Sequence, residues 1–130
     1  MFRQTKRTEA AFRSDLIKHL ELHGAVAVPV ESRATTRGLG DLLVVWQGVT
    51  ALVELKDVHG KETPALRPSQ RAFCRRAAKA GAAYFLVARH ADHHYSLRDP
   101  RIDPEVGVVC TTVEGMAQTL LQFTQHKEVA

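Results

Sequence analysis

The 130-residue sequence predicts an α/β fold in which a mixed central sheet is flanked by helices. Three observations support this prediction. An apolar stripe with helical spacing lies near the N-terminus, and two short apolar segments joined by a turn follow it. A second helical segment then leads into an almost wholly apolar strand, typical of the centre of a sheet. The order of helix, three strands, helix and strand is expected to form one domain over residues 1–130.

The first predicted helix covers residues 8–23 and ends at Gly24. Its apolar stripe recurs at every fourth position and consists of Phe12, Leu16 and Leu20. Residues 25–30 are rich in valine and predict the first strand. A β-hairpin is then predicted from two short apolar segments, with a turn over residues 47–50. The two strands of the hairpin are residues 41–46 and 51–56.

Three charged side chains of this hairpin are expected to meet. Glu54 and Lys56 share a face because side chains i and i+2 of a strand point the same way, whereas Leu55 points into the other layer. The hairpin brings Asp41 beside Glu54. Such a cluster suffers charge repulsion and loss of hydration, which a divalent cation such as Mg²⁺ offsets. With that cation present, a lysine can orient a water molecule for attack on phosphorus, so the cluster predicts a phosphodiesterase site.

A structural interpretation of the same residues is simpler. An acid-apolar-lysine triplet is common on half-exposed strands, where it forms a weak surface ion pair. Asp41 at a strand start, the hairpin length and the downstream Gln70 favour the catalytic interpretation. Asp57 points to the opposite face from Glu54, and we expect it to be a surface residue.

The next elements follow from turn residues and periodicity. Residues 57–67 form an eleven-residue connection that is expected to be a mobile loop able to close over a phosphodiester substrate, and Lys61 is a candidate contact with that substrate. Residues 68–80 predict a second helix, with a proline at its start and a glycine past its end. Residues 82–88 predict the apolar central strand, and residues 95–97 a further short strand.

Two kinds of polar residue mark the second helix. Gln70 opens an otherwise apolar stripe, where its amide can reach a water molecule, a phosphate or the catalytic lysine; the alternative is a hydrogen bond to loop backbone. Basic residues recur every four positions on another face and define what we call the basic ridge: Arg67, Arg71, Arg75 and Lys79. The ridge is expected to follow a phosphate backbone or to be a solvated helix face.

The C-terminal part predicts a loop and a last helix. Thr111 and Glu114 have the spacing of a capping box that opens this helix. Its buried stripe is expected to contain Val113, Met116, Leu120 and Phe123. The histidine-rich segment 89–94 suggests a zinc site, but the absence of nearby cysteine ligands and the short strand that follows favour a polar turn.

At this point a resemblance can be stated. Gly38-Leu39-Gly40-Asp41, followed by Glu54-Leu55-Lys56, resembles the PD-(D/E)xK nuclease superfamily. More narrowly it is similar to the VRR-NUC group and to RecU-type Holliday-junction resolvases. The resemblance covers roughly residues 8–90 and includes Gln70 and the apolar strand after the second helix. Gly40 stands where the family usually has proline, which only shapes the turn before the acid.

The resemblance implies a restriction-endonuclease-like core of order αβββαβ. It also implies a divalent-metal-dependent DNA endonuclease, acting as a homodimer on four-way junctions or other branched DNA. Mg²⁺, or Mn²⁺, is expected to be held by Asp41, Glu54 and the backbone carbonyl of Leu55. Lys56 is expected to position or activate the attacking water, with Gln70 as an accessory residue.

The resemblance also suggests residues outside the hairpin. Nucleases of this kind place a further acid on the first helix near the metals, and Glu9 is the candidate; its alternative role is a favourable charge in the first helical turn. Arg33 and Arg37 lie in the loop before the hairpin and are candidates for phosphate contact. Arg37 is favoured because Gly38 and Gly40 let backbone and substrate approach closely, although loop arginines are commonly only solvated.

Composition agrees with a polyanionic partner. The net charge is +4, the pI is about 9.4, and arginine outnumbers lysine by 12 to 6. No apolar run is long enough to span a bilayer and no signal peptide is recognisable, so we expect a cytoplasmic protein without a membrane partner. Cys74 and Cys110 share no metal-ligand spacing and are expected to be free thiols.

Two other functions stay open at this stage. One is a non-catalytic DNA-binding module that keeps a nuclease-like fold. The other is a restriction-type subunit that needs a partner for specificity, since 130 residues leave little room for a separate sequence-reading domain.

Overall fold

The computed structural model describes residues 5–30, 41–58, 66–90, 94–99 and 107–125. Within these segments the chain forms α1 (Thr5–Leu22), β1 (Val26–Pro29), β2 (Leu42–Trp46), β3 (Val49–Val58), α2 (Pro68–Lys79), β4 (Ala83–His90), β5 (Tyr95–Arg98), β6 (Gly107–Cys110) and α3 (Val113–Thr124). None of the helices in the described part is both long and apolar enough to cross a membrane.

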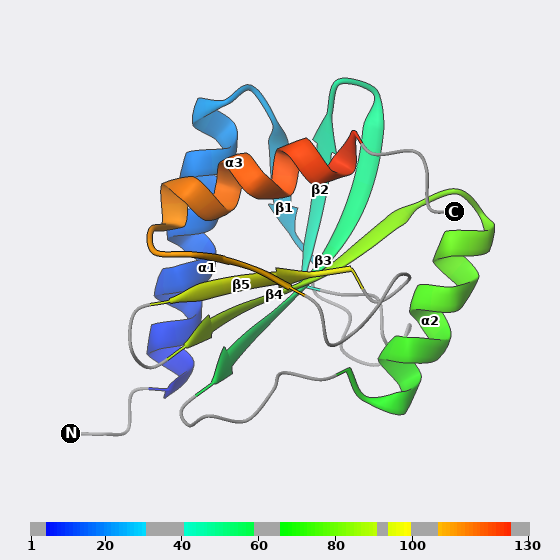
Figure 1. The fold of residues 1–130 in the computed structure, drawn as a ribbon, viewed down its shortest axis with the longest axis horizontal. Coiled ribbons are helices and arrows are strands. Elements are labelled where there is room, and N and C mark those ends of the chain that lie inside the picture. Colours follow the sequence, from blue (N-terminus) through cyan, green and yellow to red (C-terminus); the bar gives the residue numbers. More distant parts are fainter. Residues whose placement is uncertain (1–4, 31–40, 59–65, 91–93, 100–106, 126–130) are drawn as a thin grey trace.

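The strands form one mixed sheet in the order β1-β2-β3-β4-β5-β6. Strands β3 and β4 pair in parallel, and the other neighbouring strands pair antiparallel. Helices α1 and α3 lie on one face of the sheet, and α2 lies on the other (Figure 1). The predicted α/β class, the mixed sheet and its flanking helices are therefore confirmed.

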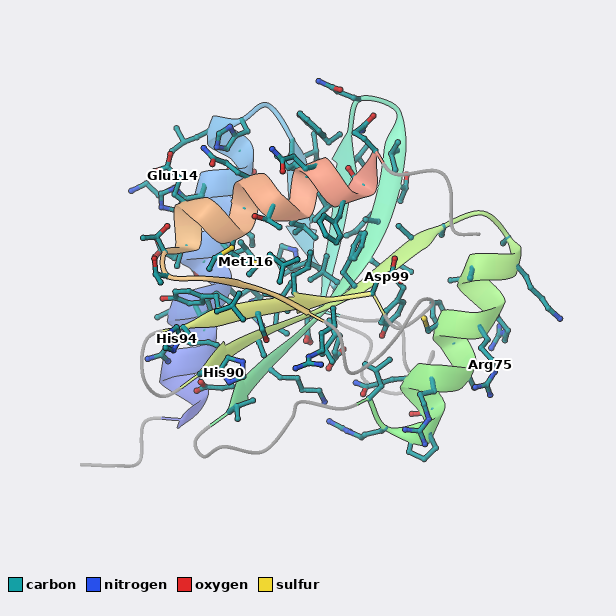
Figure 2. The ribbon with its side chains drawn as sticks, viewed as in Figure 1. Arg75, His90, His94, Asp99, Glu114 and Met116 are labelled. Carbon is teal, nitrogen blue, oxygen red and sulfur yellow. The ribbon has the colours of Figure 1, made fainter. Side chains whose placement is uncertain are left out.

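The larger part of the core lies between the sheet and the helices α1 and α3. The predicted stripe of α1 is buried there, with Phe12 5% exposed and Leu16 and Leu20 0% exposed. Met116 of α3, labelled in Figure 2, is also fully buried against this face. Burial of these apolar side chains is the main force that holds the two helices on the sheet.

A smaller cluster lies on the opposite face, beneath α2. Its members are buried residues of β3, α2 and β4 together with a loop residue: Leu52, Leu66, Cys74, Ala77, Tyr84 and Leu86. Leu52 and Glu54 point toward this cluster, whereas Leu55 packs against the larger one. The predicted separation of Leu55 from Glu54 is confirmed, because residues in a strand alternate between the faces of the sheet.

The hairpin turn is tighter than predicted. Gln47 and Gly48 have φ angles of 50° and 81°, so a two-residue turn joins the strands and Trp46 pairs with Val49. Positive φ at both positions matches the right-handed twist of the flanking strands. The strand β3 therefore begins at Val49 and not at residue 51.

Two features of the C-terminal part differ from the prediction. Strand β6 was not predicted, because Val108 and Val109 of this edge strand are 37% and 62% exposed and lack an alternating pattern. The last helix is capped by Thr112 and not by Thr111. Thr112 Oγ1 accepts a 2.9 Å hydrogen bond from the backbone N–H of Gly115, so Glu114 lies in the first turn without completing a capping box.

Candidate active site

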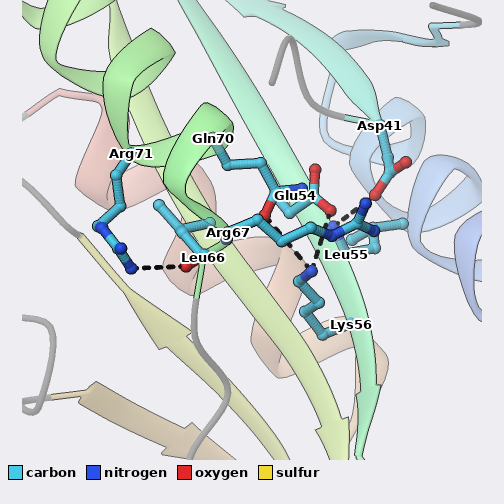
Figure 3. Close-up of polar contacts among 8 residues, drawn as sticks. All are labelled: Asp41, Glu54, Leu55, Lys56, Leu66, Arg67, Gln70 and Arg71. Atoms are coloured by element: carbon cyan, nitrogen blue, oxygen red, sulfur yellow. Dashed lines mark hydrogen bonds and ion pairs between the residues drawn. The ribbon is translucent and has the colours of Figure 1, made fainter. Parts of the chain in front are cut away.

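Asp41 is held directly against the second strand of the hairpin. Its backbone N–H donates to Val53 O at 2.7 Å, and its carbonyl accepts from Val30 N at 2.9 Å. Its carboxylate Oδ2 then accepts a 2.8 Å hydrogen bond from the backbone N–H of Leu55 (Figure 3). The side chain of Asp41 is therefore fixed at the acid-apolar-lysine triplet, as predicted.

Glu54 and Lys56 extend from one face of β3 and contact each other. Lys56 Nζ lies 3.6 Å from Glu54 Oε2, and their side chains are 21% and 8% exposed. The sequence prediction that these two side chains share a face is confirmed. A carboxylate this deeply buried is uncommon unless a partner or an ion compensates its charge.

Gln70 links this pair to helix α2. Its Oε1 accepts a 2.8 Å hydrogen bond from the backbone N–H of Arg67 and lies 3.5 Å from Lys56 Nζ (Figure 3). The residue is 6% exposed. The amide oxygen of Gln70 therefore makes both of the predicted contacts, one with Lys56 and one with the backbone before the helix.

The electrostatics of the cluster centre on Glu54. Burial is the largest cause, followed by the nearby charge of Asp41, and the pKa of the Glu54 carboxyl group is raised from 4.5 to about 7. Lys56 and the hydrogen bonds from Gln70 and Lys56 lower it, but they do not offset the rise. The bond from Leu55 N–H holds the Asp41 carboxylate beside the residue that follows Glu54, so the two negative charges repel each other.

The donor set fits a hard divalent cation. Two carboxylates and an adjacent backbone carbonyl, that of Leu55, are oxygen ligands of the kind that Mg²⁺ takes together with waters. Among the described residues no group of three or more His, Cys, Asp or Glu side chains comes together at one point. Asp41 and Glu54 are the two carboxylates that such a cation would use here.

Several predicted site residues lie outside what the structure describes. Arg33, Arg37 and Lys61 belong to segments that the structure does not describe. Glu9 lies in α1, but the side chains of this helix are described only from residue 10 onward. The roles of these four residues stay predictions.

The basic ridge of α2 is exposed, as its spacing predicted. Arg67, Arg71, Arg75 and Lys79 are all solvent-exposed, and Arg75 points away from the sheet (Figure 2). Arg71 also makes an intramolecular contact, because its Nη1 donates a 2.8 Å hydrogen bond to Leu66 O. The helix contains no acidic residue, so its surface charge is wholly positive.

The prediction for Asp57 was wrong. Its side chain is 4% exposed and its Oδ1 lies 3.6 Å from Nη1 of Arg89. The two residues are register partners in the parallel β3–β4 pair. Arg89 lies in β4, which is separated from β3 by α2 in the chain, so the hairpin alone could not predict this ion pair.

Sequence reasoning also missed Tyr84. This residue is fully buried in the cluster beneath α2, and burial together with the charge of Glu54 raises its pKa. Tyrosine in place of phenylalanine in an otherwise apolar strand was the available signal, because a buried phenol needs a polar neighbour.

Comparison with known proteins identifies the fold. No protein-family model and no curated protein sequence matches the chain. A solved structure of Archaeoglobus fulgidus Hjc, described as a Holliday junction resolvase from an archaeal hyperthermophile, matches at 16% identity and a TM-score of 0.57, over 83% of this chain and 98% of that one. A VRR_NUC domain matches at 25% identity and a TM-score of 0.52, over 65% of this chain and 86% of that one. The resemblance to VRR-NUC domains and Holliday-junction resolvases, and the fold it implied, are thereby confirmed.

Proposed function

We propose that the chain is a divalent-metal-dependent DNA endonuclease that acts on branched DNA, with the four-way junction as its first candidate substrate. The observation that carries the proposal is the convergence of Asp41, Glu54 and Lys56 at one point of the sheet. In phosphodiester hydrolysis, two neighbouring carboxylates can bind a divalent cation and an adjacent ammonium group can orient the attacking water. The fold shared with a Holliday junction resolvase supports the choice of substrate.

Each residue of the cluster has a task that follows from its position. Asp41, Glu54 and the Leu55 carbonyl would hold Mg²⁺ or Mn²⁺, which would stabilise negative charge on the phosphate oxygens. Lys56 would donate a hydrogen bond to the attacking water and orient it. Gln70 would keep the Lys56 ammonium group in place, because its Oε1 is itself anchored by the backbone at the start of α2.

The DNA would be held by positive charge outside the cluster. The basic ridge is the described candidate surface, and Arg33, Arg37 and Lys61, which flank the hairpin in the sequence, are further candidates. Glu9 would be an accessory acid. A homodimer with twofold symmetry would present two such sites to the paired strands of a junction.

The proposal is tested with purified protein and a panel of DNA substrates. Linear duplex, single-stranded, flap and four-way-junction DNA are incubated with and without Mg²⁺ or Mn²⁺. We expect metal-dependent cleavage, strongest for the junction. Asp41→Ala and Lys56→Ala are expected to abolish cleavage while salt-dependent binding is largely kept. Asp15→Ala is the matched control, because it removes a carboxylate that is 52% exposed on α1.

The outcomes separate the candidate functions. Cleavage that survives Asp41→Ala would show that the reacting site lies elsewhere. A wild-type protein that binds these DNAs but cuts none of them in either metal would be a non-catalytic DNA-binding module. Cleavage that depends on sequence and on an added protein would support a restriction-type subunit.

A further inference from the structure

The face of the sheet that carries Glu54 and Lys56 continues beyond the proposed site. Strand alternation places Val58 on this face, and the parallel register sets Ala88 beside Lys56 and His90 beside Val58. The antiparallel register of the next strand sets Ser96 beside Ala88. A row of side chains therefore runs from Lys56 across Ala88 to Ser96 and His90.

His90 and Ser96 contact each other at the end of this row. The imidazole Nε2 of His90 lies 2.9 Å from Ser96 Oγ. Ser96 is 3% exposed, whereas His90 is partly exposed beside the end of β4 (Figure 2). The contact leaves one nitrogen, Nδ1, for which the described part of the chain provides no hydrogen-bond partner.

The chemistry of this pair suits an anionic oxygen. When the Ser96 hydroxyl donates to Nε2, the proton of the neutral imidazole resides on Nδ1. Nδ1–H is then a donor on a residue that is partly exposed. A buried serine that selects the tautomer and orientation of a histidine is a common way to aim one hydrogen bond.

The distance from the proposed cutting site also fits. Adjacent strands lie about 4.8 Å apart and each residue advances about 3.3 Å along a strand, so the Cα atoms of Lys56 and His90 are roughly 8 Å apart. Two long side chains on Cα atoms this close can reach neighbouring phosphates of one DNA strand. Both residues lie toward the C-terminal ends of the parallel strands β3 and β4, the side at which sheets of this kind bind ligands.

We propose that His90 is a DNA-contacting residue that binds a phosphate adjacent to the one that is cut, and that Ser96 positions its imidazole. This assignment rests on the proposed nuclease function for its location relative to the cut. The competing explanation is that the His90–Ser96 bond only joins β4 to β5. A joint of that kind would affect stability and would leave DNA affinity unchanged.

The test maps the contact to a single phosphate. Four-way-junction DNAs are made in which one phosphate at a time, on the strands that flank the branch point, is replaced by an uncharged methylphosphonate. Dissociation constants are measured without metal by fluorescence anisotropy for the wild type and for His90→Ala, His90→Gln and Ser96→Ala. His23→Ala is the matched control, since His23 is exposed and precedes β1 at the opposite end of the sheet.

We expect one methylphosphonate position next to the cut to weaken wild-type binding about tenfold, the effect of one hydrogen bond to a charged group. That penalty should persist in His23→Ala and disappear in His90→Ala. His90→Gln should recover part of it, because an amide N–H can also donate to phosphate. Ser96→Ala should lose part of it, because Nδ1 is then no longer held as the donor.

Other outcomes would overturn the assignment. If every methylphosphonate penalty survives in His90→Ala, His90 does not contact DNA, and a melting temperature lowered equally by His90→Ala and Ser96→Ala would identify a structural joint. If the wild type binds junctions but never cuts them, the nuclease proposal fails, while the phosphate map still decides whether His90 binds DNA. If the wild type binds no DNA, both proposals are wrong.

Discussion

The carboxylate of Asp41 accepts a 2.8 Å hydrogen bond from the backbone N–H of Leu55, the residue between Glu54 and Lys56. This bond locks the acid before β2 to the centre of the triplet on β3. It also keeps the Asp41 charge close enough to Glu54 to raise the pKa of that carboxyl group. Geometry and electrostatics of the site are therefore coupled through a single side chain.

Asp41→Asn should separate these two roles. The asparagine carbonyl can still accept from Leu55 N–H, so the free energy of unfolding should change little. Loss of the charge should lower the pKa of Glu54 and reduce cleavage by at least about a hundredfold, because one metal ligand is weakened. NMR titration of the Glu54 carboxyl group and junction cleavage assays measure both effects. An unchanged Glu54 pKa would contradict the proposed proximity of the two carboxylates.

The raised pKa of Glu54 predicts an unusual pH dependence of stability. Between its ordinary value of 4.5 and about 7, the folded metal-free protein binds a proton that the unfolded chain has released. The free energy of unfolding should therefore fall as pH rises through this interval, by on the order of 3 kcal/mol in total. Urea unfolding in EDTA at pH 5 and pH 8 measures the difference.

Glu54→Gln supplies the control for this pH effect. It should remove most of the loss of stability between pH 5 and pH 8, since the amide does not titrate. Added Mg²⁺ should reverse the loss in the wild type above pH 7 and leave Glu54→Gln nearly unaffected. A wild-type stability that rises over this pH interval would contradict the pKa assignment.

Gln70→Ala should affect both cleavage and stability. It removes the acceptor for Arg67 N–H at the start of α2 and the neighbour of Lys56 Nζ. We expect the free energy of unfolding to fall by about 1 kcal/mol, as for a lost helix cap, and cleavage to fall about tenfold or more because Lys56 loses its orientation. Ser69→Ala is the control at the adjacent helix position. Wild-type cleavage by Gln70→Ala would restrict Gln70 to a structural role.

The basic ridge predicts a salt-dependent contribution to binding. Arg75→Gln should weaken binding to all DNA structures by a similar factor and reduce the slope of log Kd against log salt by about 1, the value for one lost phosphate contact. Arg71→Gln should also lower stability, because its guanidinium donates to Leu66 O. Lys18→Gln is the matched control, because Lys18 is an exposed residue of α1 on the other face of the sheet. Equal slopes for Arg75→Gln and Lys18→Gln would exclude the ridge as a phosphate-contacting surface.

The local part of the site was predictable from the sequence. Alternation along β3 places Glu54 and Lys56 on one face and Leu55 on the other, and a short hairpin necessarily brings Asp41 beside them. The stripe of α1 and the start of α2 follow from spacing in the same way. These inferences hold because each depends on residues that are close together in the chain or joined by one tight turn.

Other relationships were decided only by the tertiary structure. The pairing of Asp57 with Arg89, the position of Tyr84 near Glu54 and the row that ends at His90 all depend on the parallel register between β3 and β4. In the folded chain α2 packs across one face of these strands, and α1 and α3 pack across the other. Such contacts join strands separated by a helix and its loops, and their energies depend on burial that no local pattern in the chain contains.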